Sequence, residues 1–341
     1  MQRYFLTAFC FWLSVQTASS QTSAEGDSSV SRHYNTYRRH ITARGFLSKK
    51  YTDVSLRGPR PFRALHYRPN NAFNAGVGAS YGAVTLNLGF NLGFLDQKRD
   101  ERGKTRFLDL QSHIYTRKWV IDLYGQFYKG YYLTPRGTAA PVNHPYYLRR
   151  DMDVMVLGTS VYRLLSPGRF SYRAAFLQTE WQQHSAGSWL IGFESYHGQV
   201  KGDSALVPSL VAANYSQRDI HKLRFTEFGP GIGYAYTAVW KRHLFITGSL
   251  SLNGDLSFVR EYRDNTSQQK TAISPNISFR AVAGYNSHRW SATISWVDQT
   301  LNLRGPLSSH EYLVRTGNIR FTVAKRLQPG RRLRERLKPI E

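Results

Sequence analysis

Apolar and polar residues alternate along most of the chain between residues 60 and 326. A clear example runs from Val84 to Leu92, where every second residue is large and apolar and the residues between them are small or polar. The stretches 119–128 and 244–253 follow the same rule. Because successive side chains of a strand point to opposite faces, this period of two predicts β-strands with one apolar and one polar face.

The alternating stretches are longer than the ~5–6 residues of an average strand and suit the ~9–11 residues that a tilted strand needs to cross a bilayer. Similar stretches cover residues 105–116, 169–181, 189–198, 231–240, 272–286, 290–300 and 312–324, and residues 153–164 are β-rich but less regular. Many stretches carry Trp or Tyr near an end: Trp119, Tyr131, Tyr132, Trp181, Trp189, Trp240, Trp290 and Tyr312. Membrane barrels place such residues at both water interfaces, so the pattern predicts a transmembrane β-barrel.

The lengths of the connections indicate the orientation of this barrel. Short connections occur at 117–118, 166–168, 241–243 and 287–289, and long ones near 133–152, 258–271 and 303–311. Outer-membrane barrels have short periplasmic turns and long extracellular loops, and an even number of strands leaves both chain ends in the periplasm. We therefore predict one all-β domain, a closed antiparallel transmembrane β-barrel of about 12 strands, with 14 if residues 62–66 and 72–80 both cross. The segment 199–223 is left unassigned.

The first twenty residues have the layout of a cleaved secretory signal peptide. Arg3 precedes an apolar run from Tyr4 to Val15, and the small residues Ala18 to Ser20 follow it. We expect a signal peptide over 1–20, a basic N-terminal arm over 21–60 that is periplasmic or plugs the lumen, the barrel over 61–326, and a basic C-terminal tail over 327–341. The single cysteine, Cys10, lies inside the signal, which excludes a disulfide scaffold.

The chain is strongly basic, with 46 Lys and Arg against 22 Asp and Glu and a formal net charge of +24. Much of the excess lies in the flanks, residues 32–63 and 325–341. Such a charge is also typical of nucleic-acid binding, but an exported chain does not meet nucleic acid. We expect its partners to be outer-membrane lipids and lipopolysaccharide, the barrel-insertion machinery, and an anionic solute or polysaccharide.

Candidate chemistry is sparse. No metalloprotease, phosphate-loop, nucleophile-elbow or cysteine-rich motif is present in the sequence, so we expect no cofactor and no metal. Three acid–histidine pairs lie close in sequence: Asp109 with His113, Glu180 with His184, and His310 with Glu311. We interpret them as solvated polar groups rather than as catalytic pairs, because such pairs without a motif are common.

The charged residues at the polar positions of the alternating stretches are more informative about function, because these positions are expected to face the lumen. These residues are Asp109, His113, Asp122, Arg173, Glu194, Asp255, Arg280 and Arg320. They either line a pore that selects solutes by charge or form an ion-pair network that fills a narrow barrel. Barrel width leaves both open, since about eight strands give a filled interior and about sixteen an aqueous channel.

Several segments, taken in order, resemble an exported family of Bacteroidetes-type bacteria catalogued as domain of unknown function 4421. They are Leu65–Asn70, the glycine-rich Gly76–Gly78 with Tyr81, Thr105–Asp109, Tyr124–Tyr128 and Gly317–Phe321. The resemblance extends over nearly the whole chain after the signal peptide and implies an outer-membrane β-barrel without an established activity, so no catalytic residues are carried over. In one departure, the last strand continues into the basic tail instead of ending the chain on an aromatic residue.

These observations together predict a bacterial outer-membrane β-barrel that is not an enzyme. It would be a narrow or plugged, porin-like solute pore or a structural component of the Gram-negative envelope. Two alternatives stay open: a barrel enzyme acting on lipid or peptide, and a surface-binding protein that uses its long extracellular loops.

Overall fold

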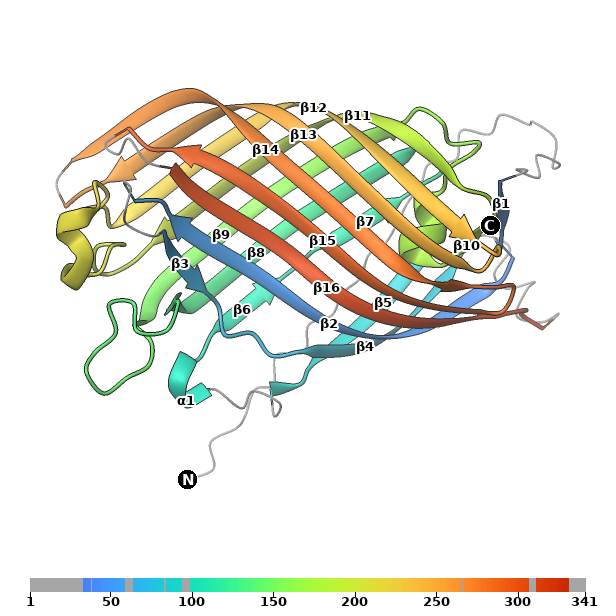
Figure 1. The fold of residues 1–341 in the computed structure, drawn as a ribbon, viewed down its shortest axis with the longest axis horizontal. Helices are drawn as coiled ribbons and strands as arrows, with labels where there is room; N and C mark the ends of the chain where they lie inside the picture. Colours follow the sequence, from blue (N-terminus) through green and yellow to red (C-terminus); the bar gives the residue numbers. More distant parts are fainter. Residues whose placement is uncertain are drawn as a thin grey trace.

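The structure, a computed structural model, describes residues 33–37, 39–58, 64–82, 84–93, 99–264, 266–306 and 311–330. The expected signal peptide lies outside these residues. The described chain forms a barrel of long, tilted strands (Figure 1). The strands of its sheet are β2 (Ile41–Leu56), β3 (Leu65–Arg68), β4 (Asn74–Tyr81), β5 (Val84–Asn91), β6 (Arg106–Asp109), β7 (Ser112–Tyr115), β8 (Trp119–Thr134), β9 (Leu148–Leu164), β11 (Ala186–Lys201), β12 (Lys222–Trp240), β13 (Leu244–Tyr262), β14 (Ser267–Asn286), β15 (Trp290–Arg304) and β16 (Glu311–Leu327).

Ten of these fourteen strands close a ring in which every neighbouring pair is antiparallel. Going round the ring, the order is β16, β15, β14, β13, β12, β11, β9, β8, β3 and β2, and β2 pairs again with β16. The short strands β4 to β7 pair along parts of β2 and β8. The predicted closed antiparallel barrel is confirmed, with a ring narrower than the expected twelve strands.

Three alternating stretches do not become ring strands: 84–92 forms β5 beside β4, 105–116 forms β6 and β7 beside β8, and 169–181 is not a wall strand at all. The stretches 62–66 and 72–80, whose crossing would have given fourteen strands, form only the short strands β3 and β4. The expected long loop at 258–271 is also wrong, because β13 and β14 continue as a paired ribbon as far as Tyr262 and Ser267.

The basic arm expected over 21–60 is wrong for residues 41–56. Ile41–Leu56 forms β2, which pairs with β16 over its whole length, from Ile41 opposite Leu327 to Leu56 opposite Tyr312. The three basic residues of this stretch conceal its alternation, since Arg44 faces inward and Lys49 outward on the same strand. Without β2 the ring would have an open edge, which a membrane barrel must avoid.

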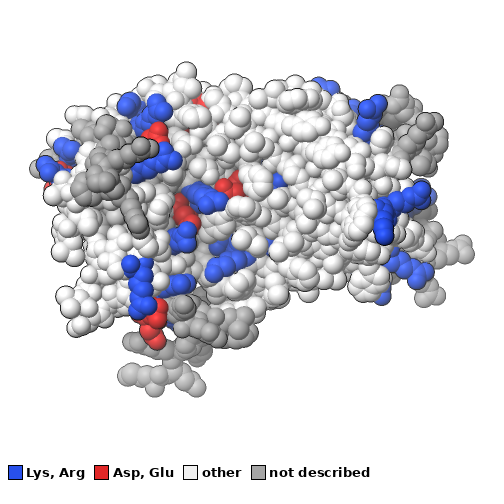
Figure 2. Space-filling model, viewed as in Figure 1, with Lys and Arg blue, Asp and Glu red and all other residues white. Residues whose placement is uncertain are grey.

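The two faces of the wall differ as the alternation predicts. Outward positions such as Ile246, Leu250 and Ile294 are apolar and exposed, whereas inward positions such as Thr247 and Asn253 are polar and buried. Figure 2 shows a broad uncharged band on one side of the barrel, with the charged side chains gathered mainly on either side of it. An exposed apolar belt on a closed barrel is the surface that lipid covers. No described helix is long and apolar enough to span a bilayer.

A polar cluster on the outward face lies beside this band. The Arg315 Nε atom is 2.7 Å from an oxygen of Asp298, and the Tyr51 hydroxyl donates a hydrogen bond to the same carboxylate. The indole Nε1 of Trp296 donates to Tyr51 Oη at 2.9 Å. Because each charged group in this cluster has its partner, the cluster leaves no free charge toward lipid.

We call the end of the barrel where β2 begins and β16 ends the inner end, and the opposite end the outer end. The short turns at 117–118, 241–243 and 287–289 lie at the inner end and join β7 to β8, β12 to β13 and β14 to β15, as predicted. At the outer end lie the connection from β8 to β9 and the connection from β11 to β12, which contains a 3-10 helix, Ser209–Asn214. A short helix, α1 (Arg99–Arg102), precedes β6.

The lumen is filled at its outer end by side chains and by the connection 202–221. Leu206, Val207 and Ile220 of this connection are buried in the same apolar cluster as inward residues of the wall such as Tyr128 and Leu133. Arg149 holds the connection in place: it pairs with Asp151 at 2.8 Å and donates to the carbonyl oxygens of Ser204 and Ala205 at 3.0 and 2.6 Å. The connection that the sequence left unassigned is therefore part of the barrel's filling.

The inner end is filled by residues 165–185, which we call the insert. It holds a π-helix, η2 (Arg173–Leu177), and the strand β10 (Glu180–Gln182), which pairs with β1 (Tyr34–Thr36). Phe170 and Tyr172 of the insert are buried against inward residues of the wall. Arg326 of β16 donates to the carbonyl oxygen of Gln178 at 2.9 Å, which ties the insert to the end of the wall.

Candidate functional site

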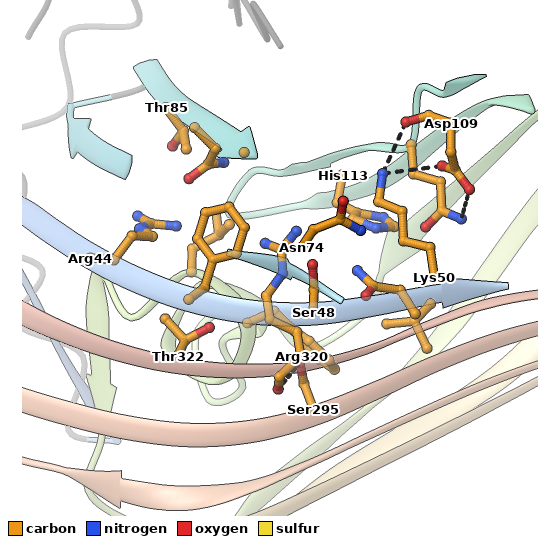
Figure 3. A pocket seen from close by; sticks show the side chains of 18 of the residues that line it. Arg44, Ser48, Lys50, Asn74, Thr85, Asp109, His113, Ser295, Arg320 and Thr322 are labelled. Atoms are coloured by element: carbon orange, nitrogen blue, oxygen red, sulfur yellow. Dashed lines mark hydrogen bonds and ion pairs between the residues drawn. The ribbon is translucent and has the colours of Figure 1, made fainter. Parts of the chain in front are cut away.

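A cavity of about 140 Å³ lies inside the barrel between the insert and the wall. Its walls come from β2, β4 and β5 on one side, β6 and β7 on another, β15 and β16 on a third, and η2 at the inner end. Figure 3 shows polar side chains from these strands converging on the space. The alternation of the strands explains the polarity, because the residues that face the lumen are those opposite the apolar outer belt.

Two arginines, Arg44 of β2 and Arg320 of β16, point into this cavity (Figure 3). The Arg44 guanidinium donates a hydrogen bond to Ser80 Oγ, and the Arg320 guanidinium lies 4.5 Å from the centre of the Phe46 ring. Neither forms an ion pair with a carboxylate of the described residues. The Nε atom of each is buried and has no hydrogen-bond partner there. Arg44 is buried and Arg320 is half-buried, and two such guanidinium groups without a counter-ion in the described chain form a site that favours an anion.

Other cavity residues add unpaired acceptors and an apolar side. The Oδ1 atoms of Asn87 and Asn318 are buried and have no partner among the described residues, so the cavity offers both donors and acceptors. Phe46, Phe107 and Phe176 supply apolar surface on the same cavity. A polar group with an attached apolar portion therefore suits the lining better than a free ion does.

The other cation of the cavity is already neutralised. The Lys50 Nζ atom is 3.1 Å from Asp109 Oδ1, and the Tyr128 hydroxyl donates to Asp109 Oδ2 at 2.5 Å. Asp109, a candidate from the sequence, therefore supports the wall of the cavity and holds Lys50 in place. The uncompensated charge of the cavity rests on the two arginines.

Three of the sequence candidates form one chain of contacts. The His113 Nδ1 atom is 2.6 Å from Asp122 Oδ1, and the Arg280 guanidinium donates to Asp122 Oδ2. Asp122 also accepts from Ser160 Oγ at 3.3 Å. Asp122 is fully buried and Arg280 nearly so, which makes this an internal ion-pair network.

Two further candidates, Glu194 and Asp255, lie with Glu227 in a buried polar layer. Asn276 Nδ2 donates to Asp255 at 3.0 Å and to Glu227 at 3.1 Å, and Gln299 Nε2 donates to Glu194 at 3.3 Å. The last candidate, Arg173, belongs to the insert and not to a wall strand, and it lies 3.7 Å from Glu180. The structure thus brings Asp109, His113 and Arg320 to one cavity and leaves the other candidates outside its lining.

The acid–histidine pairs expected from sequence proximity show other partners. His113 pairs with Asp122 instead of Asp109, and Glu180 accepts from Ser171 Oγ and faces Arg173. The third pair includes His310, which lies outside the described residues. Within the described chain no group of three or more His, Cys, Asp or Glu residues is arranged to hold a metal ion.

The sequence prediction does not include Arg44 among the lumen-facing residues, although its place in the alternating pattern indicates that it faces inward. Arg44 shares parity with Phe46 and Ser48, and all three face inward from β2. The assignment of residues 21–60 to an arm removed this strand from the search for lumen residues. Once Ile41–Leu56 is read as a strand, Arg44 and Arg320 fall on adjacent strands, β2 and β16, and face the same space.

One family model matches the sequence, and several solved structures of low sequence identity are similar to this chain. No curated protein matches the sequence. The outer membrane protease OmpT of Escherichia coli is 10% identical, with 88% of this chain and 99% of that chain covered and a TM-score of 0.38. OmpT of Vibrio cholerae is 11% identical over 84% and 98% of the two chains, with a TM-score of 0.26, and the toluene transporter TodX of Pseudomonas putida is 8% identical over 89% and 98%, with a TM-score of 0.22.

The family follows from a match over most of the sequence. The family described as domain of unknown function DUF4421 matches residues 27–324, a range that contains the whole cavity lining and all but the last residues of β16. The chain belongs to the DUF4421 family.

Proposed function

We propose that the protein is an outer-membrane β-barrel that binds a small anionic group in its lumen and does not act as an enzyme on it. The observation that carries this proposal is the pair Arg44 and Arg320, two cations that line one cavity without a carboxylate partner in the described chain. The exposed apolar belt and the closed ring of strands support a bilayer location, and the expected signal peptide supports export to the outer membrane.

The filling of the lumen favours a binding barrel over an open diffusion pore. The connection 202–221 and wall aromatic residues occupy the outer end, and the insert occupies the inner end. The sequence predicts a narrow or a plugged pore, and this filling of the lumen supports the plugged one. The ion-pair network of Asp122 and Arg280 adds to the filling between them.

The chemistry of guanidinium limits the ligand class. Arginine presents a planar set of donors that matches the paired oxygens of a carboxylate, phosphate or sulfate group. The apolar side chains on the same cavity favour an organic anion over an inorganic one.

Calorimetric titration of the purified protein in neutral detergent with inorganic phosphate and with octanoate tests the proposal. We expect both to bind, and Arg44→Gln and Arg320→Gln each to weaken binding at least tenfold, because a hydrogen bond to a charged group contributes ~1.5–3 kcal/mol. Arg304→Gln removes an arginine of the outer rim that is half exposed and should leave both affinities unchanged. Wild-type affinity in both cavity variants, or no binding by the wild-type protein, would refute the anion site.

A further inference from the structure

The wall of the barrel has a seam between β5 and the pair β6 and β7. Strand β5 pairs only with β4, and β6 and β7 pair only with β8, so nothing in the described chain joins the two groups as neighbouring strands. Toward the outer end the wall is continuous, because β3 lies between β2 and β8. Asn70 reinforces this end by donating to Thr105 Oγ1 at 2.7 Å and to the Gly103 carbonyl oxygen at 2.9 Å.

The outward side chains beside the seam are apolar. On β5, Leu86 and Phe90 are 39% and 50% exposed, and on the other flank Leu108 and Leu110 are 41% and 40% exposed. These residues continue the apolar belt of the barrel across both flanks. The seam therefore opens toward the hydrocarbon of the bilayer and not toward water.

The inward side chains beside the seam line the cavity that holds the two arginines. Thr85, Asn87 and Gly89 come from the β5 flank, and Asp109 and His113 from the other flank. Both flanks of the seam thus carry apolar side chains on the outer face and cavity-lining side chains on the inner face. Arg44 and Arg320 lie on β2 and β16, on the far side of β4 from the seam.

An unpaired strand edge at membrane depth is unfavourable, since each unsatisfied backbone group costs several kcal/mol in hydrocarbon. Irregular backbone is tolerated at that depth where it lines a cavity that can hold water or a ligand. The cavity beside β5 and β6–β7 meets this condition. The cavity therefore explains why a seam between strands is tolerated at membrane depth.

We propose that this seam is a lateral entrance through which a membrane-borne anionic amphiphile, an alkyl chain with a carboxylate or phosphate head, reaches Arg44 and Arg320. The inference rests on the proposed anion site and adds the ligand class and its route. The head is held by the arginines, and the chain lies along Phe46 and Phe107 and extends through the seam into the bilayer. The filling at both ends of the lumen leaves the bilayer as the source of the ligand.

The test closes the seam reversibly in phosphatidylcholine vesicles. Phe90→Cys and Leu110→Cys are introduced together in a Cys10→Ser background, so that these are the only thiols, and are joined by disulfide-forming bifunctional reagents of graded length. The matched control is Leu250→Cys with Phe279→Cys, two outward residues that face each other across the paired strands β13 and β14. Thiol reduction releases each bridge and restores the starting protein.

The probe is dodecanoic acid with a diazirine next to its carboxylate. Light pulses at increasing times attach it to the protein, and mass spectrometry separates labels on cavity residues of β2 and η2 from labels on the outer wall. We expect cavity labelling in the unbridged protein, its loss in Arg44→Gln with Arg320→Gln, at least tenfold slower labelling when the seam is bridged, and recovery after reduction. The bridged control pair should label at the wild-type rate.

The failures of the two proposals can be told apart. Equal labelling rates with the seam bridged and open, with labelling still dependent on the arginines, would overturn the lateral entrance and leave the anion site standing. No cavity labelling in a protein that binds phosphate through Arg44 and Arg320 would overturn the amphiphile as ligand. Absence of both labelling and phosphate binding would overturn the anion site itself, and with it this inference.

Discussion

Arg44 and Arg280 show that identical buried cations can have opposite roles in one lumen. Arg280 donates to Asp122, which also faces His113, so its charge is matched inside the protein. Arg44 has a hydroxyl partner, Ser80, but no carboxylate among the described residues. Burying an unmatched charge is unfavourable for folding, so a protein keeps one where binding requires it. By this criterion Arg280 is structural, whereas Arg44 is the arginine that suits the proposed anion site.

At the residue scale we predict that Asp122→Asn strongly destabilises the barrel. The substitution leaves Arg280 buried without its counter-charge, and removing one partner of a buried pair costs ~3–5 kcal/mol. Urea unfolding in lipid vesicles, followed by tryptophan fluorescence, measures the change in the free energy of unfolding. Asp219→Asn is the matched control, because its pair with Arg218 is exposed and should contribute only ~0–1 kcal/mol. A loss no larger than that of the control would contradict the network.

At the element scale, the sequence predicts well those strands whose outward face lies wholly on the apolar belt and whose inward face lies wholly on the lumen. The predicted stretches 119–128 and 244–253 lie within β8 and β13. Their alternation is regular because all their outward side chains belong to the apolar belt. The stretch 169–181 alternates in the same way but lies in the insert, where both sides are buried by the surrounding wall. Alternation alone cannot distinguish a wall strand from a buried segment of the insert. It shows that a segment has one apolar and one polar face, but not which strand lies beside that segment.

The same limit applies to the candidate site. Parity assigns Asp109, His113 and Arg320 to the inner face, which is where the cavity lies. Which charges neutralise one another depends on distant residues, such as Lys50 with Asp109 and Asp122 with Arg280, and no short-range pattern contains that information. The seam is equally hidden, because β5 and β6 read as ordinary strands and only their missing pairing distinguishes them.

A prediction at this scale concerns the tie between the insert and the wall. The Arg326 guanidinium donates to the Gln178 carbonyl oxygen and, at 2.8 Å, to Asn286 Oδ1, so Arg326→Ala should loosen the insert. In the Cys10→Ser background, Ser48→Cys places a thiol in the cavity, and a charged methanethiosulfonate that cannot cross lipid reports its access to water. We expect Arg326→Ala to speed this reaction at least tenfold.

The neighbouring Lys325 provides the control for this experiment. Lys325 is exposed on the outer face of β16, where it lies over the Trp290 ring, and it does not contact the insert. Lys325→Ala should therefore leave the reaction rate of the introduced thiol unchanged. If Arg326→Ala behaved like Lys325→Ala, the insert would not be the barrier between the cavity and the inner end.

At the scale of the whole molecule, the narrow ring and its filling determine how the barrel meets water. A ring of ten strands is closer to the eight that side chains can fill than to the sixteen that leave a channel. We predict that the wild-type protein is electrically silent in planar bilayers. Replacing residues 204–219 with a short glycine-serine linker should leave it silent, because inward tyrosines such as Tyr124 and Tyr128, the Asp122 network and the insert still occupy the lumen.

The conductance experiment also bears on the route of the ligand. A sixteen-stranded porin reconstituted in the same way shows that inserted channels are detected, and heat-modifiable gel mobility shows that the wild-type barrel is folded. Stepwise conductance of the wild-type protein would mean that water reaches through the lumen, so the cavity could fill from either end and the seam would lose its purpose. Silence leaves the cavity with two arginines, no aqueous path along the barrel axis, and a seam that faces lipid and that no neighbouring strand of the described chain closes. In that case the bilayer is the compartment from which an anion with an alkyl chain must come.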